Sequence, residues 1–241
     1  MINKYPSNYP TQNFANFNNF IALDSNQVAK STAIQFAHET TNYNVLGISS
    51  SIGNGATHLA LAILNEINEM NKTKEIFYSS FERLVMNNSS SNEMTILNSE
   101  YLNTKSLILI DSFFETSNKT FTKKFFDVLR DVKIKIIFTY NHGIKIPIVA
   151  KEIALTCPSK IDKEIIIKNI LEREKINLSL EIINYIADQI HLSVREIEGL
   201  IICIFASEKL GNFNADIDVV KNIHHSMVNN NLFTNQPIIA S

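Results

Sequence analysis

The chain is poor in cysteine and has no long hydrophobic run. Its 241 residues include only two cysteines, Cys157 and Cys203, and Cys203 falls in an apolar helical pattern. This usage is typical of buried free thiols in a reducing compartment rather than of a disulfide framework. The longest apolar stretch, residues 200–206, is far too short to cross a bilayer, and residues 1–20 lack the basic start and apolar run of a signal peptide. These absences predict a cytoplasmic protein without a membrane segment.

An excess of positive charge is absent as well. The 22 Lys and Arg residues are balanced by 24 Asp and Glu residues, so the formal net charge is -2. A broadly basic surface for nucleic acid would need a different balance, and a nucleic-acid-binding module is therefore disfavoured. The hydrophobic share of 45% and the length are typical of one sizeable globular α/β domain, alone or with a small second domain.

The first two thirds of the chain alternate between short β-rich runs and helical patterns. Residues 26–40 have near-helical apolar spacing behind Asp24 and Ser25, either of which is a suitable cap. The β-rich runs are residues 44–48, 75–79, 107–111 and 135–139. Strands separated by helices predict a parallel sheet with helical crossovers.

After Pro158 the pattern changes to successive helices with no strand between them. Two domains are therefore predicted: an α/β domain at residues 1–157 and a helical domain at residues 158–228. Residues 229–241 are predicted to form a flexible tail.

The segment 45–63, VLGISSSIGNGATHLALAI, has the layout of a phosphate-binding loop between a strand and a helix. Such a loop needs glycines that let backbone N–H groups face phosphates, a lysine for the outer phosphates, and a Ser or Thr for Mg²⁺. Gly53, Gly55 and Thr57 meet this pattern, whereas Ser50 replaces the first glycine and Ala56 replaces the lysine. A purely structural turn between strand and helix is the alternative.

Three further positions complete an ordered set. Asp111 ends an apolar strand, where an acid can hold Mg²⁺, but its neighbour Ser112 is not the second acid that would polarise water. Asn141 ends the next strand, where it can sense a γ-phosphate or cap a turn. Arg195, in LSVREIEG, begins a helix of the C-terminal domain and can reach phosphates or remain solvated.

Taken together, these motifs resemble the AAA+ module of the DnaA family, and in layout the shorter Hda-type regulatory inactivator of DnaA. GATHLALAI is similar to the family's phosphate-loop helix, LILIDSFF to its acidic strand, FTYNH to its first sensor, and SVREIEG to its second sensor. The resemblance implies a five-stranded AAA+ P-loop-type parallel sheet domain, a small helical lid, and assembly through AAA+ surfaces. It also implies ADP or ATP held by the set Gly53, Gly55, Thr57, Asp111, Asn141 and Arg195, with Mg²⁺ on Thr57 and Asp111 when nucleotide binds.

The departures from the family pattern define the expected function. The C-terminal DNA-binding domain of DnaA has no counterpart, so no direct sequence-specific DNA binding is expected. Residues 229–233, NNNLF, have the ending of a sliding-clamp peptide but lack its glutamine. The family's trans-acting arginine precedes the lid. In this chain the corresponding residues 143–160 contain no arginine, and their basic residues are lysines such as Lys145 and Lys151. A lysine is a point charge that cannot reproduce the planar guanidinium.

The sequence thus predicts a degenerate DnaA/Hda-like protein that regulates chromosomal replication initiation by docking on DnaA or another AAA+ protein. Nucleotide binding is expected to be weak or absent, and no residue is assigned a catalytic role. The alternative is an active ATP-hydrolysing helicase loader or initiator paralogue, in which a lysine from elsewhere replaces the missing one. Measured ATP turnover distinguishes the two.

Overall fold

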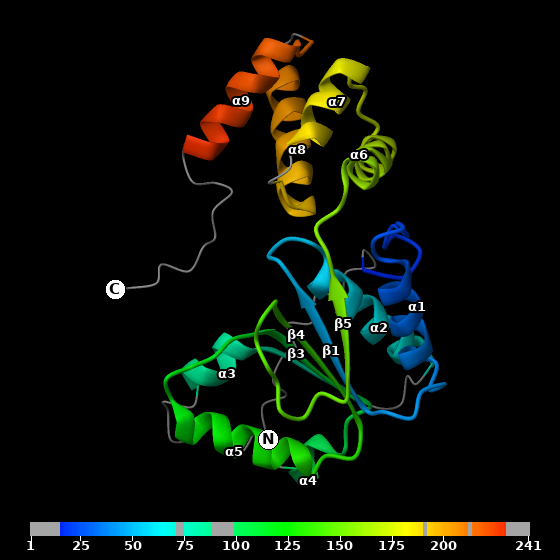
Figure 1. Ribbon diagram of the computed structural model, residues 1–241, viewed down its shortest axis with the longest axis vertical. Helices are drawn as coiled ribbons and strands as arrows, with labels where there is room; N and C mark the ends of the chain where they lie inside the picture. Colours follow the sequence, from blue (N-terminus) through cyan, green and yellow to red (C-terminus); the bar gives the residue numbers. More distant parts are fainter. Residues whose placement is uncertain (1–14, 71–74, 88–98, 190–191, 212–213, 230–241) are drawn as a thin grey trace. The chain divides into compact units, whose positions relative to one another are not determined.

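The computed structural model describes residues 15–70, 75–87, 99–189, 192–211 and 214–229 (Figure 1). The chain divides into two compact units. The first comprises Met1–Ser51 and Gly55–Thr156, and the second comprises Ile52–Asn54 and Cys157–Ser241. The predicted tail lies, apart from Asn229, outside the described residues, and so does nearly all of the clamp-like segment 229–233.

The first unit contains a five-stranded parallel sheet in the order β2-β3-β4-β1-β5. Its strands are β1 (Val45–Ser50), β2 (Ile76–Ser80), β3 (Leu107–Phe113), β4 (Lys135–Asn141) and β5 (Lys151–Leu155). The three central strands are almost entirely buried because their apolar side chains face helices on both sides. The predicted α/β fold with a parallel five-stranded sheet is confirmed.

Strand β5 was not predicted from the β-rich runs. It lies at the edge of the sheet, where only Ile153 and Leu155 of its five residues are buried. Its sequence KEIAL therefore lacks the continuous apolar run that identifies the central strands. The strand forms because its backbone pairs in register with β1, and that signal is not visible in the sequence.

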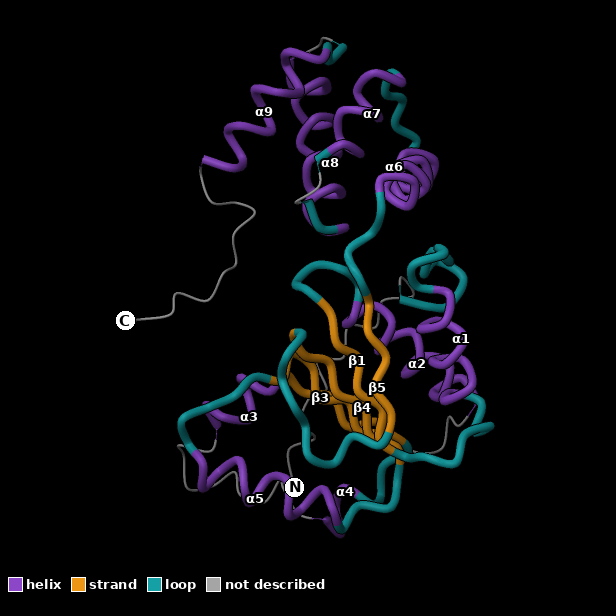
Figure 2. Tube along the Cα trace, viewed as in Figure 1, coloured by secondary structure: helices purple, strands orange, loops and turns teal. Residues whose placement is uncertain are grey.

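Helices cover both faces of the sheet (Figures 1 and 2). One face packs against α1 (Gln27–Ala37) and α2 (Ala56–Met70), whose buried residues join β1, β3 and β4 in one hydrophobic cluster. The other face packs against α3 (Phe81–Asn87) and α5 (Lys119–Arg130), with the short α4 (Ser99–Leu102) beside them. The second cluster is rich in phenylalanine, and Phe81 and Phe113 pack with their ring centroids 4.4 Å apart.

Helix α1 begins at Gln27, and neither Asp24 nor Ser25 caps it. Asn26 occupies the N-cap position, but its side chain makes no capping hydrogen bond. Its Oδ1 accepts from the backbone N–H of Leu23 at 2.9 Å and its Nδ2 donates to the carbonyl of Ile21 at 3.0 Å. The expected capping residues were wrong because the helix begins at Gln27, so the N-cap position falls on Asn26 rather than on Asp24 or Ser25.

The second unit contains α6 (Lys160–Glu174), α7 (Leu180–Asp188), α8 (Val194–Gly211) and α9 (Ile217–Asn229). Helix α6 starts with a capping box, in which Ser159 Oγ accepts from the backbone N–H of Asp162 and the Asp162 carboxylate accepts from the backbone N–H of Ser159. Among the described helices of either unit, none combines the length and apolarity that crossing a membrane requires.

Both cysteines lie in the helical unit and both are free thiols, as predicted. The expectation that they are buried was wrong. Cys157 is exposed in the segment before α6, and Cys203 is half-buried on α8. The apolar surroundings of Cys203 in the sequence, Ile201 to Ile204, are shared between the packed and the outward faces of α8, so the pattern overstated its burial.

Candidate nucleotide-binding site

The candidate site is built on the carboxyl ends of β1, β3 and β4. These strands are parallel, so their carboxyl ends meet at the same edge of the sheet. In open α/β sheets, ligands bind outside this edge. Thr57, Asp111 and Asn141, which the sequence assigns to nucleotide binding, follow or end these three strands.

The segment between β1 and α2 turns through two glycines in left-handed conformation. Gly53 has φ +83° and Gly55 has φ +95°, values that L side chains rarely adopt. Helix α2 then begins at Ala56, and its first turn contains no acidic residue. The N-terminal N–H groups of a helix carry partial positive charge, so this start suits an anion, although no lysine supports it.

Asp111 is the centre of a hydroxyl network at the end of β3. Only 8% of the residue is exposed. Its Oδ1 accepts a hydrogen bond from Thr57 Oγ1 at 2.9 Å and another from Thr139 Oγ1 at 2.5 Å. Its Oδ2 faces the hydroxyl of Tyr78 on β2 at a longer 3.5 Å. The structure thus brings together Thr57 and Asp111, the two residues predicted to hold Mg²⁺.

Tyr78 donates to this network in its neutral form. Burial, followed by the negative charge and hydrogen bonding of Asp111, raises the pKa of Tyr78 to about 12. The phenol therefore keeps its proton throughout the neutral range. It remains a donor facing the carboxylate.

Thr139 links the network to the backbone after Asp111. Its Oγ1 donates to Asp111 and accepts from the backbone N–H of Ser112 at 2.8 Å. Ser112 has φ +56°, and the pairing of β3 with β4 is irregular at this point. Ser112, at the position of the missing second acid, therefore sits in a strained backbone turn that Thr139 holds in place.

The remaining predicted site residues have separate surroundings. Asn141 is exposed at the end of β4, and its carbonyl accepts from the backbone N–H of Ile144 at 3.3 Å. Within the described residues, no hydrogen bond joins its side chain to Thr57 or Asp111. Arg195 belongs to the helical unit, in the first turn of α8, where its backbone N–H donates to the carbonyl of Gly53 at 3.2 Å. A Cβ on Gly53 would lie 2.5 Å from Ser193 Oγ, so this contact also requires glycine.

We predict that Thr139→Val destabilises the first unit by about 1–3 kcal/mol, because it leaves the Ser112 N–H without its acceptor and removes a donor from a buried carboxylate. Urea unfolding measures the change in the free energy of unfolding. The matched control is Thr122→Val, since the Thr122 hydroxyl donates to the carbonyl of Asn118 on an exposed helix turn and has no other hydrogen bond among the described residues. Equal losses for the two variants would show that the network adds no stability.

A parallel sheet of this order, with a glycine turn and helix after β1 and a buried Asp at the end of β3, defines a P-loop-type AAA+ fold. The structure is similar to domain III of the Thermotoga maritima replication initiation protein DnaA, with a TM-score of 0.77 and 19% identity over 89% of this chain and 97% of that one. It is also similar to AMPPCP-bound DnaA from Aquifex aeolicus, with a TM-score of 0.71 and 20% identity over 90% of this chain and 71% of that one.

The sequence itself matches the bacterial DnaA ATPase domain over residues 11–144, which is more than half of the chain. The chain therefore belongs to this family. A curated relative, the chromosomal replication initiator protein DnaA of Bacteroides thetaiotaomicron, is 28% identical over 234 residues, which cover 89% of this chain. The chain spans about half the length of the curated relatives it matches; for this one the share is 50%.

Proposed function

We propose that this protein is a degenerate, Hda-like regulator of chromosomal replication initiation that acts in the cytoplasm by docking on DnaA or another AAA+ replication protein. The observation that supports this most directly is the loss of the lysine from an otherwise retained phosphate loop. The fold, the two glycines and the Thr57–Asp111 pair are retained, while Ala56 stands at the lysine position. An architecture kept without its charged phosphate ligand suits docking better than turnover.

The residues present fit a nucleotide with Mg²⁺, though with fewer ligands than the family pattern. Thr57 and Asp111 offer a hydroxyl and a carboxylate 2.9 Å apart, which are oxygen donors that Mg²⁺ accepts. The glycine turn and the start of α2 would hold phosphates, with Asn141 and Arg195 as sensors. Loss of one charged hydrogen bond removes about 1.5–3 kcal/mol, so we propose weak binding with ADP at least as good as ATP.

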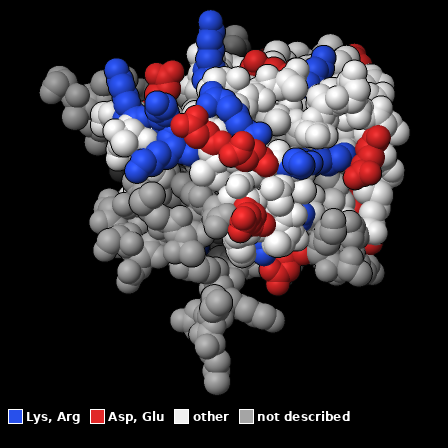
Figure 3. Space-filling view, turned by 90° about the horizontal axis from the view of Figure 1, so that it is seen from below, with Lys and Arg blue, Asp and Glu red and all other residues white. Residues whose placement is uncertain are grey.

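The positions of the arginines support docking without stimulated hydrolysis. Arg130 pairs with Asp127 at 2.6 Å, and Arg173 pairs with Glu174 and Glu198. Arg83 lies on α3, Arg195 on α8, and residues 143–160 contain no arginine. On the face in Figure 3, basic and acidic side chains are interspersed, which does not favour a continuous nucleic-acid track.

The experiment that tests the proposal is sedimentation of the purified chain with purified DnaA from the same cell. We expect a faster-sedimenting complex at micromolar concentration, with or without nucleotide on this chain, because docking does not depend on an intact phosphate loop. An unrelated protein of similar size serves as the control for non-specific association. The proposal is wrong if neither DnaA nor the cell's other AAA+ replication proteins co-sediment with the chain.

A further inference from the structure

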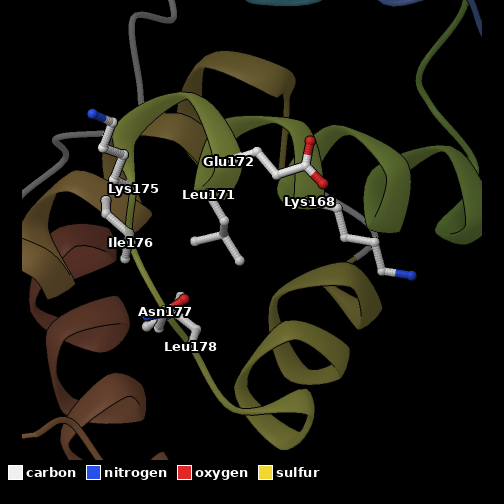
Figure 4. Close-up of a pocket in the computed structure, with 7 residues that line it drawn as sticks. All are labelled: Lys168, Leu171, Glu172, Lys175, Ile176, Asn177 and Leu178. Carbon is white, nitrogen blue, oxygen red and sulfur yellow. The ribbon is translucent and has the colours of Figure 1, made fainter.

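Two lysines, Lys168 and Lys175, are among the residues that line a hollow of about 350 Å³ at the end of α6. Figure 4 shows that their ammonium groups point in opposite directions, away from the hollow. The two lysines therefore do not converge on a common ligand. The buried carboxylate of Asp111 in the first unit differs from this hollow, because the hydroxyls of three other residues do converge on it.

The two oxygens of the Asp111 carboxylate have unequal partners. Oδ1 accepts hydrogen bonds from two hydroxyls, Thr57 Oγ1 at 2.9 Å and Thr139 Oγ1 at 2.5 Å. A carboxylate oxygen has about two lone-pair sites for such bonds, so Oδ1 is fully engaged. Because one donor comes from α2 and the other from β4, together they hold the carboxylate in one orientation.

Oδ2 is the oxygen of Asp111 that has acceptor capacity left. In the part of the chain that the structure describes, its one hydrogen-bond partner is the Tyr78 hydroxyl, which donates across 3.5 Å. Hydroxyl-to-oxygen hydrogen bonds normally measure about 2.5–3.0 Å, so this bond is weak. A magnesium ion is attracted to the same lone pairs and binds carboxylate oxygens, so it can displace such a donor.

The ring of Tyr78 is held near Asp111 independently of this weak bond. Tyr78 is half-buried on β2 and packs against the hydrophobic cluster that α1 and α2 form with the sheet. The pairing of β2 with β3 places Tyr78 beside Leu109, two residues before Asp111. Tyr78→Phe therefore removes the hydroxyl from Oδ2 while the packing of the ring is kept.

We propose that Tyr78 limits the Mg²⁺ dependence of nucleotide binding, because its hydroxyl competes with the metal for Oδ2 of Asp111. Thr139 has the opposite effect: it is a positioning residue that engages Oδ1 and so leaves Oδ2 for the cation. Neither side chain is assigned a contact with the nucleotide itself. The inference rests on the proposed function, since Mg²⁺ enters this site together with a nucleotide.

The test measures the binding of methylanthraniloyl-ADP to the full chain by fluorescence anisotropy, once with Mg²⁺ and once with EDTA. The measured quantity is the ratio of the two affinities. We expect Tyr78→Phe to raise this ratio about two- to fivefold, because the metal no longer displaces a hydrogen bond. The affinity in EDTA should equal that of the parent, since the hydroxyl does not contact the nucleotide.

Thr139 variants separate positioning from a merely structural role. Thr139→Val is expected to lower the ratio toward one, because the carboxylate loses the donor that orients it. Thr139→Ser keeps a hydroxyl and should restore the ratio of the parent. A merely structural role would weaken binding equally with Mg²⁺ and with EDTA, and the ratio would stay unchanged.

The matched control is Tyr185→Phe, which removes a phenol hydroxyl in the helical unit, 2.8 Å from Nδ1 of His224, and should leave the ratio unchanged. The inference is overturned if Tyr78→Phe has a ratio at or below that of the parent, or if the Thr139→Val ratio equals that of the parent. If methylanthraniloyl-ADP does not bind the parent in either condition, the proposed nucleotide site is wrong and this inference is wrong with it. Failure to co-sediment with DnaA would contradict the docking proposal and leave the ratio unaffected.

Discussion

Addition of the purified chain to ATP-loaded DnaA from the same cell is expected to leave the rate of phosphate release unchanged. A trans-acting arginine contributes about 10³ to 10⁵ in rate to such reactions, because its planar guanidinium stabilises the charge of the transferring phosphoryl group. Residues 143–160, where the family places this arginine, contain none. A steady-state phosphate-release assay with and without excess chain measures the effect directly.

The same segment contains three exposed lysines, of which Lys160 is paired with Asp188. The other two, Lys145 and Lys151, are point charges and lack the bidentate geometry of arginine. An acceleration of the order expected from arginine, abolished by Lys145→Ala or Lys151→Ala, would contradict the degenerate-regulator proposal. The chain would then be an active regulator that stimulates ATP hydrolysis by DnaA. Turnover by the isolated chain would instead favour the alternative of a helicase loader or initiator paralogue.

Four of the five strands, including the edge strand β2, were predicted from their β-rich runs, whereas the edge strand β5 was not. Residues 107–111 and 135–139 form continuous apolar runs, and both lie inside observed strands that are buried on both faces. Strand β5 has mostly exposed residues, with only Ile153 and Leu155 buried, and it is held in the sheet by its pairing with β1. Strand β5 therefore depends on tertiary pairing, which its local pattern does not encode.

The site was partly predictable for a similar reason. Thr57 and Asp111 follow from loop and strand-end chemistry, and the structure places them in contact. Thr139 and Tyr78 were missed, because a hydroxyl on a buried strand becomes informative only once the neighbouring strand is known to hold the Asp. The available signal was a threonine within the apolar run of β4, two residues before Asn141.

The two ends of α6 differ in how well residue preferences predict them. Ser159 is followed by Asp162 in the usual capping pattern, and the structure contains that capping box. Lys175 ends the same helix in a left-handed conformation that residue preference assigns to glycine. Such an exception cannot be read from propensity, because the preference opposes the observed residue.

The nucleotide site itself is best tested by restoring its missing charge. Ala56→Lys is expected to strengthen ATP binding by roughly ten- to a hundredfold, because a charged hydrogen bond to a phosphate contributes about 1.5–3 kcal/mol. The gain should be larger for ATP than for ADP, since the lysine of such loops reaches the outer phosphates. Isothermal titration calorimetry with and without Mg²⁺ measures both affinities.

The position of Ala56 determines the control for this experiment. Ala56 begins α2 but is only 9% exposed and belongs to the hydrophobic cluster beneath the sheet. A lysine there must direct its apolar stem along the cluster and its ammonium outward, as long cationic side chains do. Ala56→Met adds a stem of similar length without the charge, so any gain from packing alone would appear in both variants. If Ala56→Lys is folded, as judged by its melting temperature, and binds ATP no better than Ala56→Met, the loop is a structural turn and not a phosphate site.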